Sequence, residues 1–385
     1  MAIKVSSRTD ISPFHVMEVM RAAADREARG EPVLHLEVGQ PSSRAPMQAR
    51  IAAIRAIEND VLGYTSAVGI RELRERISEH YLAWYKTDID PDRVVLTMGA
   101  SGAFTLAFLA CFEVGDRVVV PSPGYPCYRN TLKALGIEVV DLQVGPETRF
   151  QPSSSMLDDL GSIDGLVIAS PSNPTGTMLL PDELQSLISW CRSHDVRLIS
   201  DEIYHGITFG LSASSAISQW DQAVVVNSFS KYFSMTGWRL GWLILPENLI
   251  SPVERLAQNA YIAAPSISQY AALGAFDSLD ELENNIASYA RNRKMLIEGL
   301  PLLGITKLAP ADGAFYVYAD VSAFTTDSQK LAASWLEDFS IATTPGIDFD
   351  LQNGHKYIRF SFAGSAEDIK ETLRRLNTWA QQEQV

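Results

Sequence analysis

The chain has 385 residues, of which 46% are hydrophobic and 20% charged, as expected for a globular protein of roughly two or three domains. Its formal net charge of −14 argues against a general affinity for nucleic acid or for an anionic membrane surface. Residues 1–12 contain no hydrophobic core of signal-peptide length, and no apolar run approaches the ~18 residues of a membrane span, which favours a cytoplasmic protein. The three cysteines, Cys111, Cys127 and Cys191, are widely spaced and predict reduced packing residues, and no metal site is predicted.

Short β-branched runs alternate with helical patterns through the middle of the chain. The predicted strands are 94–98, 117–121, 138–142, 166–170, 197–200, 223–227 and 241–245. Helical patterns fall between several of them, notably at 102–112 and at 181–194, where Pro-Asp-Glu is typical of a first helical turn. This alternation predicts an α/β fold, with an open, mostly parallel sheet and helices on both faces.

The regular alternation of strand and helix patterns is lost towards both ends of the chain. Residues 13–29 predict an amphipathic helix, and the C-terminal third mixes helices with short strands such as 314–319 and 357–362. Neither end has the composition of a self-sufficient domain. We therefore predict an N-terminal arm at 1–12, a large α/β domain at 45–285, and a smaller α+β domain formed by 13–44 together with 286–385.

The strand 223–227 ends in Ser-Phe-Ser-Lys, which places Lys231 at the carboxyl end of a buried strand, where ligands bind in open α/β sheets. Desolvation lowers the pKa of a lysine and makes its amine nucleophilic, and one use of such an amine is an imine with pyridoxal phosphate. Ser228 and Arg239 offer a hydroxyl and a cationic fork that suit the phosphate of that cofactor. The alternative is a solvated loop lysine near an arginine, and the motif alone does not decide between them.

The other predicted strands end in residues that match this chemistry. Ala100 and Ser101 lie in a small-residue turn whose free N–H groups suit a phosphate, although a plain N-cap explains the turn as well. Tyr125 is a candidate to lie against an aromatic ring, unless it only covers the core. Asn173, in a proline-rich turn, is able to donate to a phenolate-like oxygen.

A carboxylate and a phenol follow the strand 197–200. An aspartate that keeps the pyridine nitrogen protonated lets pyridoxal phosphate act as an electron sink, and Asp201 is placed to do so, with Tyr204 nearby. The alternative is that Asp201 caps the next helix and Tyr204 packs. Each strand end is ambiguous alone, but all of them meet at one edge of the sheet.

Taken together, these segments resemble the class I/II aminotransferases, which are fold-type I pyridoxal phosphate enzymes, over about residues 12–376. The most specific matches are Ser-Pro-Ser-Asn-Pro-Thr-Gly (170–176), Asp-Glu-Ile-Tyr (201–204), Ser-Phe-Ser-Lys (228–231), Gly-Trp-Arg-Leu-Gly (237–241) and Tyr-Ile-Arg-Phe-Ser-Phe-Ala (357–363). The chain departs from the family at Asp350, where glycine is frequent, and at Gly102, where many relatives have glutamine.

The resemblance implies a role for each of these residues. Lys231 would form the imine with the cofactor and carry a proton between Cα and C4′. Asp201 would hold the pyridine nitrogen, Asn173 and Tyr204 would contact the ring hydroxyl, and Tyr125 would stack on the ring. These roles imply transamination, in which the α-amino group of an L-amino acid passes to a 2-oxo acid by ping-pong kinetics.

Further contacts implied by the resemblance concern the phosphate and the substrate. The groups expected at the phosphate are the backbone N–H groups of Ala100 and Ser101 and the side chains of Ser228 and Arg239. Arg359 would clamp the substrate α-carboxylate with help from the backbone of Gly39. Tyr64 would reach a phosphate in the neighbouring subunit, which implies a homodimer with shared active sites. The alternative is that Tyr64 and Arg359 are ordinary interface or sheet residues.

Two other functions remain open at this point. The same fold and lysine serve β-lyases and decarboxylases. A serine acyl-enzyme is the more distant alternative, because 228–231 match Ser-x-x-Lys and 128–130 match Tyr-x-Asn. The order of these two pieces is reversed and Lys-Thr-Gly is absent, which argues against it. No residue identifies the pocket for the substrate side chain.

Overall fold

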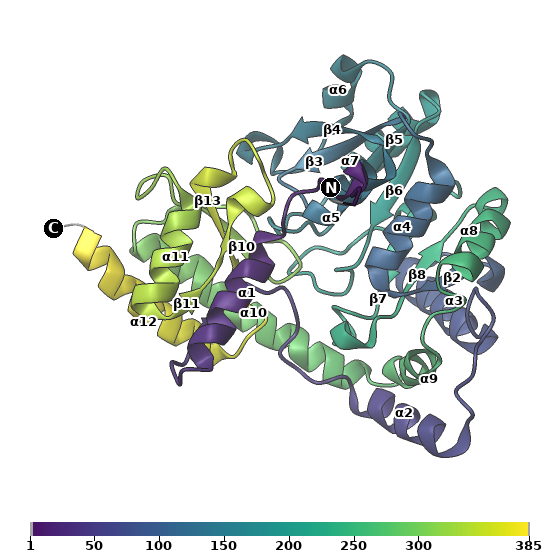
Figure 1. Ribbon diagram of the computed structural model, residues 1–385, viewed down its shortest axis with the longest axis horizontal. Coiled ribbons are helices and arrows are strands. Elements are labelled where there is room, and N and C mark those ends of the chain that lie inside the picture. The colour runs from purple at the N-terminus through teal and green to yellow at the C-terminus, as the bar shows by residue number, and fades with distance from the viewer. Residues whose placement is uncertain (1–2, 384–385) are drawn as a thin grey trace.

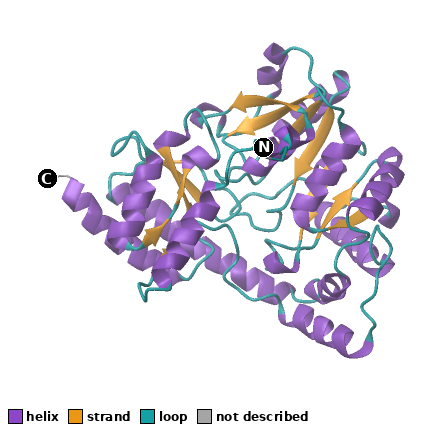
Figure 2. Cartoon of the chain, in the orientation of Figure 1, coloured by secondary structure: helices purple, strands orange, loops and turns teal. Residues whose placement is uncertain are grey.

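The computed structural model describes residues 3–383, so the first two residues of the predicted arm and the last two of the predicted small domain lie outside it. Strands gather in two separate regions, each flanked by helices (Figure 2). Among residues 3–383, no helix is both long enough and apolar enough to cross a membrane.

The larger region contains a seven-stranded sheet in the order β2-β8-β7-β6-β5-β3-β4. The strands are β2 (Val94–Thr97), β3 (Arg117–Ser122), β4 (Glu138–Gln143), β5 (Gly165–Ala169), β6 (Arg197–Asp201), β7 (Val224–Ser228) and β8 (Gly241–Ile244). All neighbours are parallel except β8, which is antiparallel to β2 and to β7. The predicted mostly parallel sheet is confirmed.

Helices cover both faces of this sheet. The helices in contact with its strands are α3 (Arg71–Tyr85), α4 (Gly99–Cys111), α5 (Pro126–Leu135), α7 (Pro181–Ser193) and α8 (Glu247–Ala260). In addition, α2 (Met47–Asn59) packs against α9 (Ser266–Ala275), and α6 (Ser154–Leu157) packs against α7. Successive side chains of β7 enter two different cores: Val224 and Val226 pack on one face and Val225 on the other. Burial on both faces explains why central strands such as β5 and β8 are apolar runs without a polar alternate position.

The smaller region combines both ends of the chain. An antiparallel sheet in the order β12-β13-β10-β9 consists of β9 (Lys307–Leu308), β10 (Tyr316–Asp320), β12 (Thr344–Pro345) and β13 (Tyr357–Ser361), and β1 (Leu34–His35) pairs in parallel with β11 (Ile341–Ala342). The helices here are α1 (His15–Glu27), α10 (Leu279–Leu302), α11 (Ser328–Phe339) and α12 (Ala366–Glu383).

Figure 1 shows α1, in purple, in the smaller region, where it contacts β11 and β12, and far from α2, which follows it in the sequence. The pairing of β1 with β11 explains this position, because it fixes the N-terminal segment to the C-terminal elements. Helix α10 runs from the smaller region towards α9 and crosses the predicted boundary at 285/286 (Figure 1). The division into two domains at that residue stays a prediction.

Candidate active site

A cavity of about 230 Å³ lies at the carboxyl edge of the parallel strands, and β10 and β13 contribute to its wall. This edge is where ligands bind in open α/β sheets. The sequence-predicted residues that line the cavity are Gly39, Ala100, Ser101, Tyr125, Asn173, Asp201, Tyr204, Lys231, Arg239 and Arg359. Within the described chain, the other two predicted residues, Ser228 and Tyr64, are not part of this wall.

Lys231 follows β7 by three residues and points into the cavity region, where its Nζ donates a hydrogen bond to the carbonyl of Gly39. The Nζ atom lies 5.8 Å from the ring centroid of Tyr204 and 5.9 Å from that of Phe315. Removal from water, together with the positive charges of Arg359 and Arg239, lowers the pKa of Lys231 to about 7, against the opposing effect of Asp201. The amine is therefore partly neutral near neutral pH.

Asp201, the last residue of β6, is 4% exposed. Its carboxylate accepts hydrogen bonds from two neutral donors, the hydroxyl of Tyr128 and the backbone N–H of Ile203, the latter at 3.1 Å. Burial raises the pKa of Asp201 to about 6 despite these bonds. The alternative that Asp201 caps a helix is wrong, since a turn and not a helix follows β6. The site therefore holds a buried carboxylate that a cationic ligand would stabilise.

Arg359 lies in β13 and is 3% exposed. One Nη donates to Oδ1 of Asn173 at 2.8 Å, and the other donates to the carbonyl of Glu37 and to Oγ1 of Thr344, the latter at 3.2 Å. The guanidinium carbon lies 4.4 Å from the ring centroid of Tyr316 and 4.8 Å from that of Phe349. Hydrogen bonds and two aromatic rings thus fix the plane of this cation, as bidentate recognition of a carboxylate requires.

Tyr204 is tied to β10, because its hydroxyl and that of Tyr316 lie 2.6 Å apart. Burial raises the pKa of Tyr204 well above its usual value, so the phenol stays protonated. A Cβ added to Gly39 would lie 1.8 Å from the hydroxyl of Tyr316. Only glycine therefore allows the backbone at residue 39 to approach both Tyr316 and Lys231.

The side of the cavity predicted to hold a phosphate is formed by the start of α4 and by Arg239. Ala100 and Ser101 lie in the first turn of α4, whose N–H groups have no partner within the helix. A Cβ added to Gly99, which has φ +68°, would lie 2.5 Å from Nη2 of Arg239, so glycine leaves room for the guanidinium. The local fold thus brings a cation to a helix N-terminus.

Ser228 does not line the cavity in the described structure. It is buried, and its hydroxyl donates to the carbonyl of Leu240 at 2.9 Å and accepts from the N–H of Ser230 at 3.1 Å. Ser230, two residues later, lines the cavity instead. In the described structure, Ser228 supports the turn that carries Lys231, and its contact with a phosphate stays a prediction.

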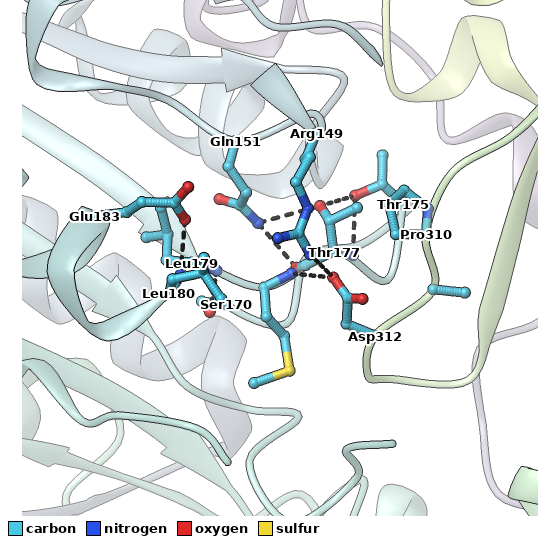
Figure 3. Close-up of polar contacts among 12 residues, drawn as sticks. Arg149, Gln151, Ser170, Thr175, Thr177, Leu179, Leu180, Glu183, Pro310 and Asp312 are labelled. Carbon is cyan, nitrogen blue, oxygen red and sulfur yellow. Dashed lines mark hydrogen bonds and ion pairs between the residues drawn. The ribbon is translucent and has the colours of Figure 1, made fainter. Parts of the chain in front are cut away.

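The turn that carries Asn173 is held by a polar network, which Figure 3 shows around Thr177. Gln151 Nε2 donates to the carbonyl of Thr177 at 2.8 Å and to that of Ala169 at 3.2 Å. From the other side, Asp312 accepts from Arg149 at 2.6 Å and from the N–H of Met178 at 3.3 Å (Figure 3). Because Asp312 lies just before β10, the network links the turn to the strand that carries Tyr316.

Tyr125 precedes α5 and lines the cavity, with its ring 5.8 Å from that of Phe14 and 5.4 Å from that of Tyr128 in edge-on geometry. Apolar side chains of α1 and of the residue before it continue the wall from there. They are Phe14, Val16, Met17 and Met20. Tyr64 lies elsewhere, in the loop between α2 and α3, and is 84% exposed.

Sequence reasoning missed several residues of the site. Tyr128 binds Asp201, Tyr316 binds Tyr204, and Phe349 packs on Arg359. Tyr128 lies three residues after Tyr125 on α5, and that helical spacing was a usable signal. The positions of Phe349 and of the α1 residues carry no such signal, because only the pairing of distant segments brings them to the cavity.

Comparison with known proteins agrees with this geometry. Residues 31–376 match the family model described as aminotransferase class I and II. A valine–pyruvate aminotransferase of Mycobacterium tuberculosis is 50% identical, with 98% of this chain and 99% of that protein covered. The crystal structure of an aminotransferase from M. tuberculosis has a TM-score of 0.97 at 50% identity, covering 99% of this chain and 100% of that one. An aspartate aminotransferase from Thermus thermophilus with maleate has a TM-score of 0.93 at 29% identity, covering 98% and 100%.

The fold and the cavity define an α/β enzyme in which a lysine, a buried carboxylate and two arginines surround one site. The chain belongs to the class I and II aminotransferase family, and it is an aminotransferase. These relatives do not support the serine acyl-enzyme alternative. The Tyr-x-Asn element on which that alternative depended has other partners in the structure: Tyr128 donates to Asp201, and Asn130 donates to the carbonyl of Ser12 at 3.4 Å.

Proposed function

We propose that the cavity binds pyridoxal 5′-phosphate through Lys231 and that the enzyme moves the α-amino group of an apolar L-amino acid to a 2-oxo acid. The observation that carries the proposal is the placement of Lys231. Its amine, with the pKa lowered to about 7, shares one cavity with Asp201 and Arg359. The related aminotransferases favour transfer of the amino group over the β-lyase and decarboxylase alternatives.

Three features of the site fit this cofactor and its substrate. The buried carboxylate of Asp201 has neutral hydrogen-bond partners and would gain a cationic one from a protonated pyridine nitrogen. Arg239 and the first turn of α4 form a place for a phosphate. Nε of Arg359 is buried and has no hydrogen-bond partner among residues 3–383, and a substrate carboxylate would supply one.

The chain's own residues then have distinct tasks. Arg359 orients the α-carboxylate, and Asn173 and Thr344 hold the guanidinium in place. Tyr128 orients Asp201, while Asn173 and Tyr204 supply polar groups to the cofactor ring and Tyr125 supplies an aromatic face. When bound, pyridoxal phosphate accepts electrons and thereby weakens the bond between Cα and its hydrogen. The neutral amine of Lys231 takes that proton and returns it, as general base and then general acid.

An apolar substrate side chain is favoured by the charges of the wall. Among the described residues, the cations that line the cavity are Lys231, Arg239 and Arg359, and each already has a task. The wall of the cavity includes instead the apolar side chains of Met17 and Met20. The name of the valine–pyruvate aminotransferase relative supports the same substrate class, with pyruvate as the oxo acid.

We also propose a homodimer in which Tyr64 completes the site of the other subunit. Support comes from a run of exposed apolar side chains along α2 and the loop after it, namely Ile54, Ile57, Val61 and Tyr64. Burial of such a patch against a second copy would stabilise the assembly. A cytoplasmic location stays a prediction of the sequence.

The test is chemical labelling of the purified protein loaded with pyridoxal phosphate. Borohydride reduction followed by peptide mass analysis should find the pyridoxyl mass on Lys231. Lys231→Ala should remove that mass and lower transamination by roughly 10⁴-fold or more, while the circular dichroism spectrum stays native. Label on a different lysine, or normal turnover of Lys231→Ala, would show that the proposal is wrong.

A further inference from the structure

Asp348 is a buried carboxylate that the proposed reaction does not use. It is the last residue of the 3-10 helix Gly346–Asp348 and is 2% exposed. Its two oxygens accept hydrogen bonds from the first N–H groups of α1: His15 N donates to Oδ1 at 3.1 Å and Val16 N donates to Oδ2 at 3.2 Å. Phe14, at the N-cap of α1, provides no side-chain cap. A carboxylate 333 residues further along the chain than His15 therefore caps this helix.

The backbone of Asp348 and Phe349 is also bound to the segment that carries Tyr125. Arg129 of α5 donates to the carbonyl of Asp348 at 2.7 Å and to that of Phe349 at 3.3 Å. The N–H of Gly124 also donates to the carbonyl of Phe349, at 3.1 Å. Gly124 and Arg129 flank Tyr125 in sequence, so the segment 348–349 fixes α1 relative to the proposed ring-binding wall.

The same segment is in contact with the proposed carboxylate anchor. The ring of Phe349 lies 4.8 Å from the guanidinium carbon of Arg359. Asp348 therefore joins three parts of the site: the start of α1, the wall that carries Tyr125, and Arg359. A displacement of α1 would change its distance from Arg359, and with it the space left for a substrate side chain.

Helix α1 presents apolar groups to that space. Met17 and Met20 are three residues apart on one face of the helix and both line the cavity, as does Phe14. Met17 is 57% exposed, which places a flexible apolar side chain at the rim. Asp348 itself is not among the cavity-lining residues of the described chain, so its effect on a substrate is indirect, and α1 is the element whose N–H groups its carboxylate binds.

We propose that Asp348 is a positioning residue for substrate selection, which holds the apolar residues of α1 against the side chain of the amino-acid substrate. This inference rests on the proposed transamination of apolar amino acids. Because the methyl group of alanine is too short to gain much from the α1 residues, the effect of Asp348 should grow with the length of the substrate side chain.

The first test is the variant Asp348→Asn in the cofactor-loaded enzyme. The amide keeps the size of the carboxylate but offers one acceptor oxygen, and its NH₂ group faces a backbone donor. The ratio of kcat/KM for L-leucine or L-valine, whichever the wild type uses better, to kcat/KM for L-alanine should fall about tenfold. The loss should lie mainly in KM for the longer substrate, and affinity for pyridoxal phosphate should stay unchanged.

Three further variants distinguish the loss of the helix cap at α1 from a general disturbance of the structure. Asp350→Asn is the matched control, because this buried carboxylate on the same segment accepts from Gln352 N and Asn353 N and does not contact α1. It should leave the substrate ratio unchanged. Met17→Ala should lower the ratio directly. His15→Pro removes one donor to Asp348 at a helical position that tolerates proline, after an extended Phe14, and should lower the ratio without altering Asp348.

Hydrogen exchange provides a readout that does not depend on turnover. The amides of the first turn of α1 should exchange faster in Asp348→Asn and in His15→Pro than in Asp350→Asn. The positioning role would be overturned if the ratio of kcat/KM values stayed unchanged in both Asp348→Asn and His15→Pro, or if the ratio fell equally in Asp350→Asn. Either result would leave the proposed transamination intact. A wild type that transaminates no amino acid would overturn the proposed function and this inference together.

Discussion

At the scale of single residues, the cavity moves two ionisable groups towards their neutral forms. Burial lowers the pKa of Lys231 to about 7 and raises that of Asp201 to about 6, and in both cases loss of hydration is the largest cause. A pair of groups whose pKa values approach neutral pH is typical of a site that transfers protons. The same desolvation that prepares Lys231 for chemistry should cost stability.

The stability lost by burying the Lys231 amine predicts a pH-dependent effect of Lys231→Met on the unfolding of the cofactor-free protein. The pKa of Lys231 is about 7 in the folded state against 10.5 for an ordinary lysine, so protonation favours the unfolded state. This penalty is complete below about pH 7 and disappears as the pH rises past 10.5. Lys231→Met should therefore have the larger free energy of unfolding at pH 7, and its advantage should shrink towards pH 10. Urea unfolding over this range measures the difference, and a constant advantage would contradict the lowered pKa.

At the scale of elements, the site depends on turns held by close packing. The turn that carries Asn173 passes through Gly176, which has φ +69°. A Cβ there would lie 2.8 Å from the carbonyl oxygen of Gly313 and 3.0 Å from the Cα of Ala311. Both are backbone atoms of the segment that leads into β10, so neither can move as a flexible side chain would.

This geometry predicts a large cost for Gly176→Ala. Gly30→Ala is the matched control, because Gly30 has φ +83° but no atom lies within 4 Å of the place that its Cβ would occupy. The control should lose about 1 kcal/mol from the left-handed backbone alone. Gly176→Ala should lose about 3 kcal/mol or more, because a steric clash adds to the backbone strain. Denaturant unfolding of both variants compares them, and equal losses would mean that the turn relaxes freely.

The strands and helices that were given bounds from the sequence agree closely with the structure, and the differences have local causes. Each predicted strand of the large sheet matches within one residue at either end, because parallel strands buried on both faces are recognisable apolar runs. Helix α4 begins at Gly99, three residues before the predicted start, since the small-residue turn is itself its first turn. Strand β10 begins at Tyr316, after Ala314 with φ +55°, where an extended backbone is interrupted.

At the scale of the whole molecule, the exposed position of Tyr64 becomes informative. Its side chain is 84% exposed and lies outside the cavity of its own chain. If Tyr64 contacts the phosphate in a second copy, its loss must affect the partner's site and spare its own. This distinguishes a shared active site from a role within one subunit.

Subunit mixing tests this arrangement. Lys231→Ala and Tyr64→Ala homodimers should both be weakly active or inactive at limiting cofactor. Refolded together, the two variants should form hybrid dimers, in which each site combines Lys231 of one subunit with Tyr64 of the other. One site then has both substitutions and the other has neither, so up to about half of the hybrid's sites recover activity. Recovery of transamination on mixing supports a shared site. No recovery, or a monomer in sedimentation, would contradict it.

The sequence by itself determined the α/β class, the strand ends and the residues that follow those strands at the cavity, such as Asp201 and Lys231. These features are local, because a buried apolar run predicts a strand and the residue after it lies at the sheet edge. Tertiary structure alone decided that Ser230 and not Ser228 lines the cavity, that Tyr316 binds Tyr204, and that Asp348 caps α1. Such contacts join segments far apart in the chain or depend on the rotation of a single turn. Local sequence patterns do not show which distant segments come into contact, because the packing of the two sheet regions determines these contacts.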